Sequence, residues 1–177
     1  QKALLANLRR GAGKAPGELP ALWGVLLEDF PEEWMNSRGA PSRAEWAAYI
    51  ALTLFAVHQQ GNDPAASPMH CAGCPLGRAV RRLVPADDVD AEIRILRRFE
   101  QMATAVEIQG VSQHLRGIVQ LLRAGGIPLD YAALAHDLYQ YQFPEAVAGV
   151  RLRWAQDFYR RPLEDKDNTN TSEGKED

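Results

Sequence analysis

Hydrophobic residues recur every three or four positions along most of this 177-residue chain. That spacing places them on one face of an α-helix, and nowhere does a long period-two alternation predict a strand. In residues 111–124, for example, Val111, Leu115, Ile118 and Leu122 fall on one side of a helix. The pattern predicts an all-α protein.

Turn residues and caps divide this pattern into about eight helices. Ser42 stands three residues before Glu45, a capping box in which each side chain satisfies a backbone N–H of the other residue. The segment 28–41 is predicted to be irregular. The predicted helices span about residues 2–10, 21–27, 43–60, 75–84, 90–104, 111–124, 131–142 and 144–161.

A loop at residues 61–74, with Gly and Pro, separates the helices into two groups. We predict two small packed bundles, an N-terminal one over residues 1–60 and a C-terminal one over residues 75–162. Residues 163–177 hold six acids and two bases, with no apolar residue after Leu163. Such a segment cannot bury apolar surface, so it is predicted to be a disordered acidic tail.

The charge distribution changes the meaning of the net charge. The whole chain carries −3, which by itself argues against a nucleic-acid partner. Without the tail, residues 1–162 hold 18 bases and 17 acids, and 16 of those bases are Arg. Arginine offers a planar fork of donors that matches phosphate oxygens, so the body of the protein remains compatible with nucleic acid.

Several basic residues share helix faces. Arg78, Arg81 and Arg82 have i, i+3, i+4 spacing on a predicted helix that has no acid of its own, and Arg116 and Arg123 lie seven apart, opposite an apolar stripe. Together these sets predict an extended basic surface. Other bases that contribute to basic blocks are Lys2, Arg9, Arg10 and Lys14, in an acid-free start of the chain, and Arg153 and Arg160 on the last helix.

The charge of a second set of arginines on one helix face is predicted to be neutralised by neighbouring acids. Arg94, Arg97 and Arg98 have the same spacing, but Asp90 and Glu100 lie close to them in sequence. A solvated face with ion pairs is therefore expected on this helix.

Two clusters are candidates for metal chemistry. Cys71 and Cys74, next to His70, have the spacing of a zinc-chelating pair, but a closed site needs four ligands and no second pair exists. His136 and Asp137 resemble the metal-binding dipeptide of HD-type phosphohydrolases, yet nothing in the spacing selects the further His and Asp that such a site needs. Two loop cysteines without a metal, and no cofactor or catalytic residue, are therefore expected.

The cellular setting follows from what the sequence does not contain. It shows no disulfide framework, no apolar run near the roughly 20 residues of a membrane-spanning helix, and no signal peptide. A cytoplasmic protein without a membrane partner is expected.

An ordered set of stretches covering most of residues 1–162 resembles one known family. The chain is similar to the small subunit of Cascade, the subtype I-E CRISPR surveillance complex, a family also called CasB. The matching stretches are LRRGAGKAPG (8–17), LTLFAVHQ (52–59), LGRAVRRL (76–83), RRF (97–99), GIPLDY (126–131) and VRLRWAQDFY (150–159).

The resemblance implies an all-α, non-enzymatic subunit that takes part in antiviral defence. It implies a head-to-tail dimer with a second copy, contacts with the guide-bearing backbone subunits and the large subunit, and binding to crRNA and target DNA, especially the displaced strand. Such a subunit holds the nucleic-acid backbone, because base pairing reads the sequence. The residues to which the resemblance gives this role are Arg9, Arg10, Arg81, Arg82, Arg116, Arg123, Arg151 and Arg153; Lys14 and Arg78 join them from the charge pattern.

Two alternatives remain open at this point. One is the metal-dependent phosphohydrolase that uses His136 and Asp137. The other is a protein-only scaffold whose arginines pair with the acidic blocks of a neighbouring copy, at residues 15–50 and 87–110.

Overall fold

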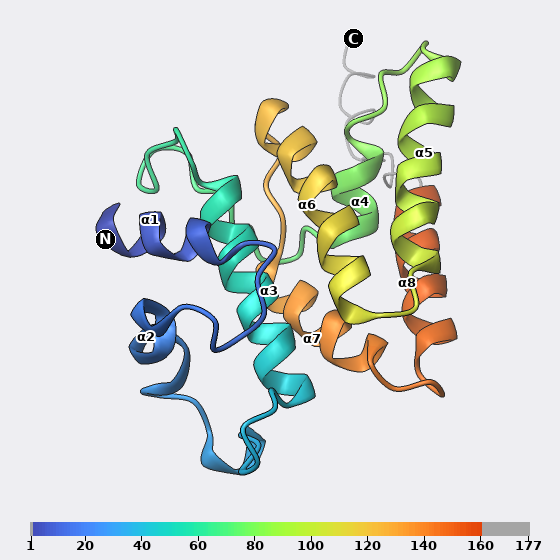
Figure 1. Cartoon of the computed structure of the whole chain (residues 1–177). Coiled ribbons are helices and arrows are strands. Elements are labelled where there is room, and N and C mark those ends of the chain that lie inside the picture. Colours follow the sequence, from blue (N-terminus) through green and yellow to red (C-terminus); the bar gives the residue numbers. More distant parts are fainter. Residues whose placement is uncertain (1, 161–177) are drawn as a thin grey trace, which may run out of the picture.

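The computed structural model describes residues 2–160, and these form a helical protein with helices packed on several sides of a central one (Figure 1). Residues 2–160 contain no strand, only an isolated bridge between His70 and Leu129. The predicted all-α class is confirmed. The α-helices are α1 (Lys2–Gly11), α2 (Trp23–Leu27), α3 (Arg43–His58), α4 (Leu76–Arg81), α5 (Val89–Thr104), α6 (Ile108–Ala124), α7 (Tyr131–Tyr141) and α8 (Val147–Tyr159).

Local signals explain where several helices begin. The Glu45 N–H donates to Ser42 Oγ at 3.0 Å and the Ser42 N–H donates to Glu45 Oε2 at 2.6 Å, so the predicted capping box opens α3. Asp130 Oδ1 accepts from the N–H groups of Ala132 and Ala133 and caps α7.

Several details differ from the sequence prediction: α6 begins at Ile108 and not at Val111, and α4 ends at Arg81 and not at Val84. The last helix begins at Val147 and not at Pro144, because the preceding residues form a turn in which the Ala146 N–H donates to the Phe143 carbonyl at 2.9 Å. The segment predicted to be irregular contains a short 3-10 helix at Glu32–Trp34.

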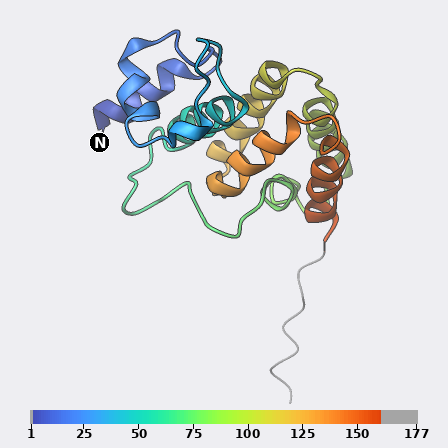
Figure 2. The same cartoon turned by 90° about the horizontal axis from the view of Figure 1, so that it is seen from below.

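Helix α3 lies in the middle of the molecule and is buried on several sides. Its Ile50 and Leu54 belong to the main hydrophobic cluster together with Leu115 of α6 and Leu134 of α7, while its Tyr49 belongs to a smaller cluster with α1 and α2. Figure 2 shows α1 and α2 at one end of the molecule and α5 and α8 at the other. The division into two bundles stays a prediction, and the predicted tail at 163–177 lies outside the described residues.

Helices α4 and α8 cross very closely at Gly77. A Cβ atom at this position would overlap the Trp154 carbonyl oxygen and lie 2.9 Å from Asp157 Cβ. Only glycine lets the two helix backbones approach in this way. This crossing fixes the arginines of both helices relative to one another. None of the helices in residues 2–160 is both long and apolar enough to cross a bilayer.

Candidate nucleic-acid interface

The ten basic residues predicted from the sequence fall into two groups. We define the α1–α6 surface as the five that lie on α1, on the loop after it and on α6: Arg9, Arg10, Lys14, Arg116 and Arg123. We define the α4–α8 surface as the five on α4, directly after it and on α8: Arg78, Arg81, Arg82, Arg151 and Arg153.

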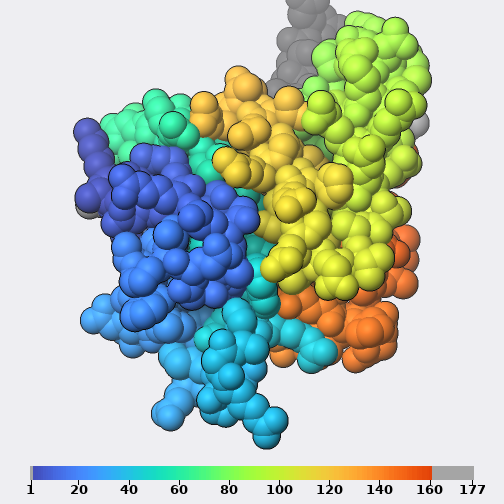
Figure 3. All heavy atoms as spheres, in the orientation of Figure 1, coloured from blue at the N-terminus to red at the C-terminus, as the bar shows by residue number. Residues whose placement is uncertain are grey.

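Tertiary structure joins α1 to α6 although they are far apart in sequence. Arg116 Nη1 donates to the Ala12 carbonyl oxygen at 3.4 Å, across 104 positions of the chain. Gly13 follows with a φ of +89°, and a Cβ there would lie 3.4 Å from Arg116 Nη1. Figure 3 shows α1 and its loop (blue) directly beside α6 (yellow) on one face of the molecule. The basic end of α1 and the basic side of α6 are therefore parts of one surface.

The side chains of the α1–α6 surface keep their positive charge uncompensated. Arg123 Nη1 donates to the neutral Gln60 Oε1 at 3.0 Å, as Arg116 donates to a backbone carbonyl. Within residues 2–160, none of the five bases forms an ion pair. The neutral partners of Arg116 and Arg123 orient their guanidinium groups without neutralising them, which leaves the charge available to an anion in solution.

The outer side of α6 adds neutral hydrogen-bonding groups to these charges. Gln109, Gln113 and Gln120 are exposed, and α6 contains no Asp or Glu from Ile108 to Ala124. The prediction from sequence missed Gln109 and Gln113. Their four-residue spacing and their place opposite the apolar stripe are the signal that would have identified them.

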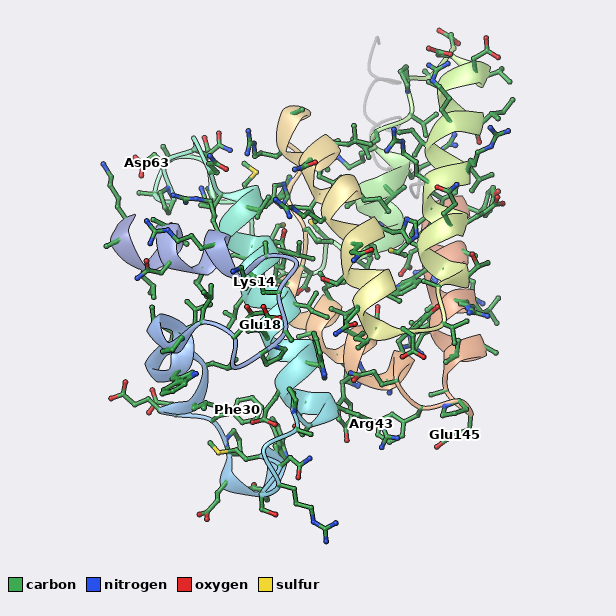
Figure 4. The ribbon with its side chains drawn as sticks, in the orientation of Figure 1. Lys14, Glu18, Phe30, Arg43, Asp63 and Glu145 are labelled. Carbon is green, nitrogen blue, oxygen red and sulfur yellow. The ribbon has the colours of Figure 1, made fainter. Side chains whose placement is uncertain are left out.

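One acid lies on the loop of this surface. Lys14 and Glu18 are both labelled in Figure 4, on the loop that follows α1. The Glu18 carboxylate accepts from the Ala15 N–H at 2.6 Å, so it closes the loop on itself and forms no ion pair with Lys14 in the described structure.

The α4–α8 surface differs, because three of its five bases have acidic or aromatic partners. Arg81 Nη1 pairs with Glu92 Oε1 of α5 at 2.8 Å, and its guanidinium lies 5.4 Å from the centre of the Phe158 ring. Helix α4 contains no acid of its own, but the charge of Arg81 is still compensated, because the neighbouring helix α5 supplies Glu92. Arg94 pairs with Asp88 at 3.9 Å, so α5 carries an ion pair as expected, although with a different acid.

Both arginines of α8 also contact α7. Arg153 Nη2 donates to Asp137 Oδ1 at 2.8 Å and to Gln140 Oε1 at 2.7 Å. Arg151 lies over the Tyr141 ring and donates to its hydroxyl at 3.2 Å. These contacts hold α7 and α8 together.

Arg78 and Arg82 are the exceptions on the α4–α8 surface. Both are exposed, and the structure over residues 2–160 gives neither an ion pair. They are the residues of this group whose charge is most available to a ligand.

The candidate metal dipeptide does not have the geometry of a metal site. Trp154 Nε1 donates to Asp137 Oδ2 at 2.8 Å, and Arg153 occupies Oδ1, so both carboxylate oxygens bind protein donors. No group of three or more His, Cys, Asp or Glu residues that could hold a metal ion occurs within the described range. The residues present do not fit the phosphohydrolase alternative.

A groove of about 650 Å³ opens between the start of α3, α7 and the segment around Glu32–Trp34, and none of the ten bases lines it. Aromatic rings of Phe30, Trp34 and Tyr139 and alanines of α3 and α7 line this groove. Arg43, which also lines it, stacks over the Phe143 ring at 4.4 Å. The groove is mainly apolar and does not carry the chemistry of a phosphate site.

Comparisons with known proteins agree on one family. The family model described as CRISPR-associated protein Cse2 matches residues 4–159. The crystal structure of CasB from Thermobifida fusca is 40% identical, with a TM-score of 0.72, and the match covers 90% of this chain and 85% of that one. No curated protein sequence matches the chain significantly.

Two more distant structures have the same fold, and both come from Thermus thermophilus. The structure described as CasB is 23% identical with a TM-score of 0.63, and the one described as a CRISPR-associated protein of the Cse2 family is 24% identical with a TM-score of 0.66. Each match covers 89% of this chain and 85% of the other. The extent of the family match and the identity to the Thermobifida protein show that this chain belongs to the CRISPR-associated Cse2 family, also called CasB, the small-subunit family of the type I-E Cascade complex.

Proposed function

We propose that this chain is a non-catalytic Cascade subunit that holds nucleic-acid backbone on its α1–α6 surface. The observation that carries the proposal is the contact of Arg116 with the Ala12 carbonyl, which brings five bases without ion pairs in residues 2–160 onto one face. Family membership supports a place in the CRISPR complex. The bound nucleic acid is crRNA and target DNA, above all the displaced strand, and the protein acts in the cytoplasm beside a second copy, the backbone subunits and the large subunit.

The physical mechanism is electrostatic and independent of base sequence. Each phosphate neutralised by Arg or Lys releases condensed counterions, so affinity falls steeply with salt. The amides of Gln109, Gln113 and Gln120 add donors for phosphate and sugar oxygens, which position a backbone without reading its bases. In an RNA-guided complex such a surface is sufficient, because the guide supplies specificity.

The α4–α8 surface has a mainly structural role in this proposal. Arg81 and Arg153 already pair with Glu92 and Asp137, so binding a phosphate there would compete with an existing partner. Arg78 and Arg82 extend the interface only where the nucleic acid reaches α4.

The test uses the assembled complex with a doubly substituted subunit. Arg116→Ala with Arg123→Ala is compared with Arg97→Ala with Arg98→Ala, a matched control that removes the same charge from exposed positions of α5. We expect the first variant to weaken DNA binding by about tenfold or more near physiological salt, and to lower the slope of log affinity against log salt by about 2. The control is expected to change neither quantity.

The measurement is R-loop stability at several salt concentrations, with subunit incorporation into the complex as a check. Normal incorporation with unchanged R-loop stability in the Arg116/Arg123 variant would reject this surface. A different result would favour the protein-only scaffold. In that case the double variants bind DNA as the native complex does, while less of the variant subunit is incorporated into the complex.

A further inference from the structure

Cys71 and Cys74 bring two thiols together in a turn that the proposed function does not use. Their Sγ atoms lie 2.8 Å apart, and both side chains are partly exposed to solvent. Reagents in solution can therefore reach a pair of sulfurs that already face each other.

The backbone between the two cysteines is closed into a turn. The Cys74 N–H donates to the Cys71 carbonyl oxygen at 3.2 Å, and Gly73 has a φ of +78°, a value that L side chains rarely adopt. This conformation brings the first and fourth residues of the turn together. The proximity of the sulfurs is thus built into the local backbone.

Tertiary hydrogen bonds hold the turn against the segment between α6 and α7. The Cys71 N–H donates to the Leu129 carbonyl at 3.2 Å, and the Asp130 N–H donates to the Cys74 carbonyl at 2.8 Å. The Gly73 N–H also donates to Asp130 Oδ2 at 2.8 Å. Both cysteines and the residue before Cys74 are therefore fixed by contacts from outside the turn.

The same contacts argue against a metal as the reason for the pair. His70 Nδ1 accepts from the Tyr131 N–H at 3.2 Å, so the nearest imidazole uses that nitrogen to bind backbone. Throughout residues 2–160 no third ligand completes a cluster around the two sulfurs. Two close thiols without further ligands are suited to thiol–disulfide exchange.

We propose that Cys71 and Cys74 form a redox-active pair that low-molecular-weight disulfides convert into an intramolecular disulfide. In the first step the Cys71 thiolate attacks one sulfur of the small disulfide, forms a mixed disulfide and releases one small thiolate. In the second step the Cys74 thiolate attacks Cys71 Sγ, which forms the Cys71–Cys74 bond and releases the second small thiolate. Two protein thiols are oxidised and one small disulfide is reduced to two thiols.

The hydrogen bond between the sulfurs sets the order of the two attacks. Cys74 Sγ donates to Cys71 Sγ, and this hydrogen bond is the main cause that raises the pKa of Cys74, with burial as a further cause. Cys74 therefore holds its proton more tightly than an ordinary thiol, and Cys71 is the thiol that reacts first. Once Cys71 is in the mixed disulfide, the bond that holds the proton on Cys74 is lost, and Cys74 becomes free to attack.

The test exposes the full chain to oxidised glutathione in buffers of graded glutathione redox state. Reactions are stopped with an alkylating reagent and analysed by intact mass and peptide mapping. The native chain is expected to lose both thiols and two hydrogen atoms, without a lasting glutathione adduct. Its thermal midpoint is expected to stay the same or rise, because the tertiary contacts already hold the turn closed.

Two matched variants test the order of reaction. In Cys74→Ser a glutathione adduct is expected to accumulate on Cys71, because no second thiol can displace it. In Cys71→Ser the adduct on Cys74 is expected to form several-fold more slowly. The double variant should remain unmodified under all conditions.

Three results would overturn the proposal. These are a lasting glutathione adduct on the native chain, disulfide-linked dimers in place of the internal bond, or two thiols that remain alkylatable in the most oxidising buffer. If a variant fails to fold, the measurement on the native chain is sufficient to test the proposal. It needs no nucleic acid, so its result is independent of the function proposed above.

Discussion

His58 Nδ1 lies 2.9 Å from the hydroxyl oxygen of Tyr131, and this pair joins α3 to α7 inside the core. The hydroxyl also donates to the Leu54 carbonyl at 3.3 Å, so Tyr131 contacts both a side chain and the backbone of α3. His58 is 0% exposed, and its Nε2 atom has no hydrogen-bond partner within residues 2–160. A buried neutral imidazole of this kind couples folding to pH.

Stability is therefore expected to fall as the solution becomes acidic. The pKa of His58 is lowered from 6.5 to about 4, mainly by burial and also by the nearby charge of Arg123, while the backbone of Ile127 and Leu122 opposes the shift. Because the folded pKa lies below the unfolded one, the unfolded chain binds the proton first. The contribution is complete above about pH 6.5 and is lost as the pH falls through about 4, which amounts to about 3 kcal/mol.

Urea unfolding between about pH 4 and about pH 7.5 measures this loss. His58→Gln removes the titrating group and is expected to flatten the pH dependence of stability below about pH 6.5 relative to the native chain. Equal pH profiles for both proteins would contradict the assignment.

The hydroxyl of Tyr131 is expected to contribute to stability through the same pair. Tyr131→Phe leaves the buried Nδ1 atom of His58 without its hydrogen-bond partner, at a cost of about 1–3 kcal/mol in the free energy of unfolding. Tyr139→Phe is the control, because that side chain is 40% exposed and should change stability by less than about 0.5 kcal/mol. Chemical denaturation of both variants at neutral pH compares them directly.

The close approach of α4 and α8 is expected to tolerate no side chain at Gly77. Gly77→Ala places a Cβ against the Trp154 carbonyl oxygen and should destabilise the protein by about 3 kcal/mol or more, since backbone atoms cannot move aside without separating the helices. Gly117→Ala lies on α6 with no atom within 4 Å of the added Cβ and should stabilise the protein by up to about 1 kcal/mol. Thermal melts in which the two variants have equal midpoints, or in which Gly77→Ala is the more stable, would contradict the packing described.

Arg116 and Arg81 are expected to differ in their effect on DNA binding, because only Arg81 forms an ion pair in the described structure. Arg116→Gln should weaken DNA binding by the assembled complex and lower the salt slope by about 1. Arg81→Gln should leave the slope nearly unchanged, because Glu92 already compensates the Arg81 charge, and should reduce stability by up to about 1 kcal/mol. A larger binding defect for Arg81→Gln than for Arg116→Gln would assign the nucleic acid to the α4–α8 surface instead.

Local signals in the sequence predicted most helix positions correctly. The Ser42–Glu45 capping box and the Asp130 cap depend on neighbours within three residues, so their geometry follows from spacing alone. The start of the last helix was predicted too early at Pro144. A proline is suited both to a turn and to the first turn of a helix, and the turn at Phe143–Ala146 formed here.

The basic surfaces were only partly predictable. Spacing on a helix correctly placed Arg116 and Arg123 away from the apolar stripe. It could not show that Glu92 of α5 reaches Arg81 of α4, or that Ala12 and Arg116 meet across 104 positions. Such pairs depend on how helices cross, and crossing is decided by contacts such as the one at Gly77.

The sequence by itself determined the all-α class, the approximate helices, the family resemblance and the excess of arginine over lysine. These depend on periodicity, on local hydrogen bonds and on composition, all of which are properties of neighbouring residues. Only the tertiary structure decided which arginines keep uncompensated charge, and which buried groups, such as His58 and Tyr131, depend on one another. Charge and burial are set by distances between helices, and the packing of side chains around α3 fixes those distances.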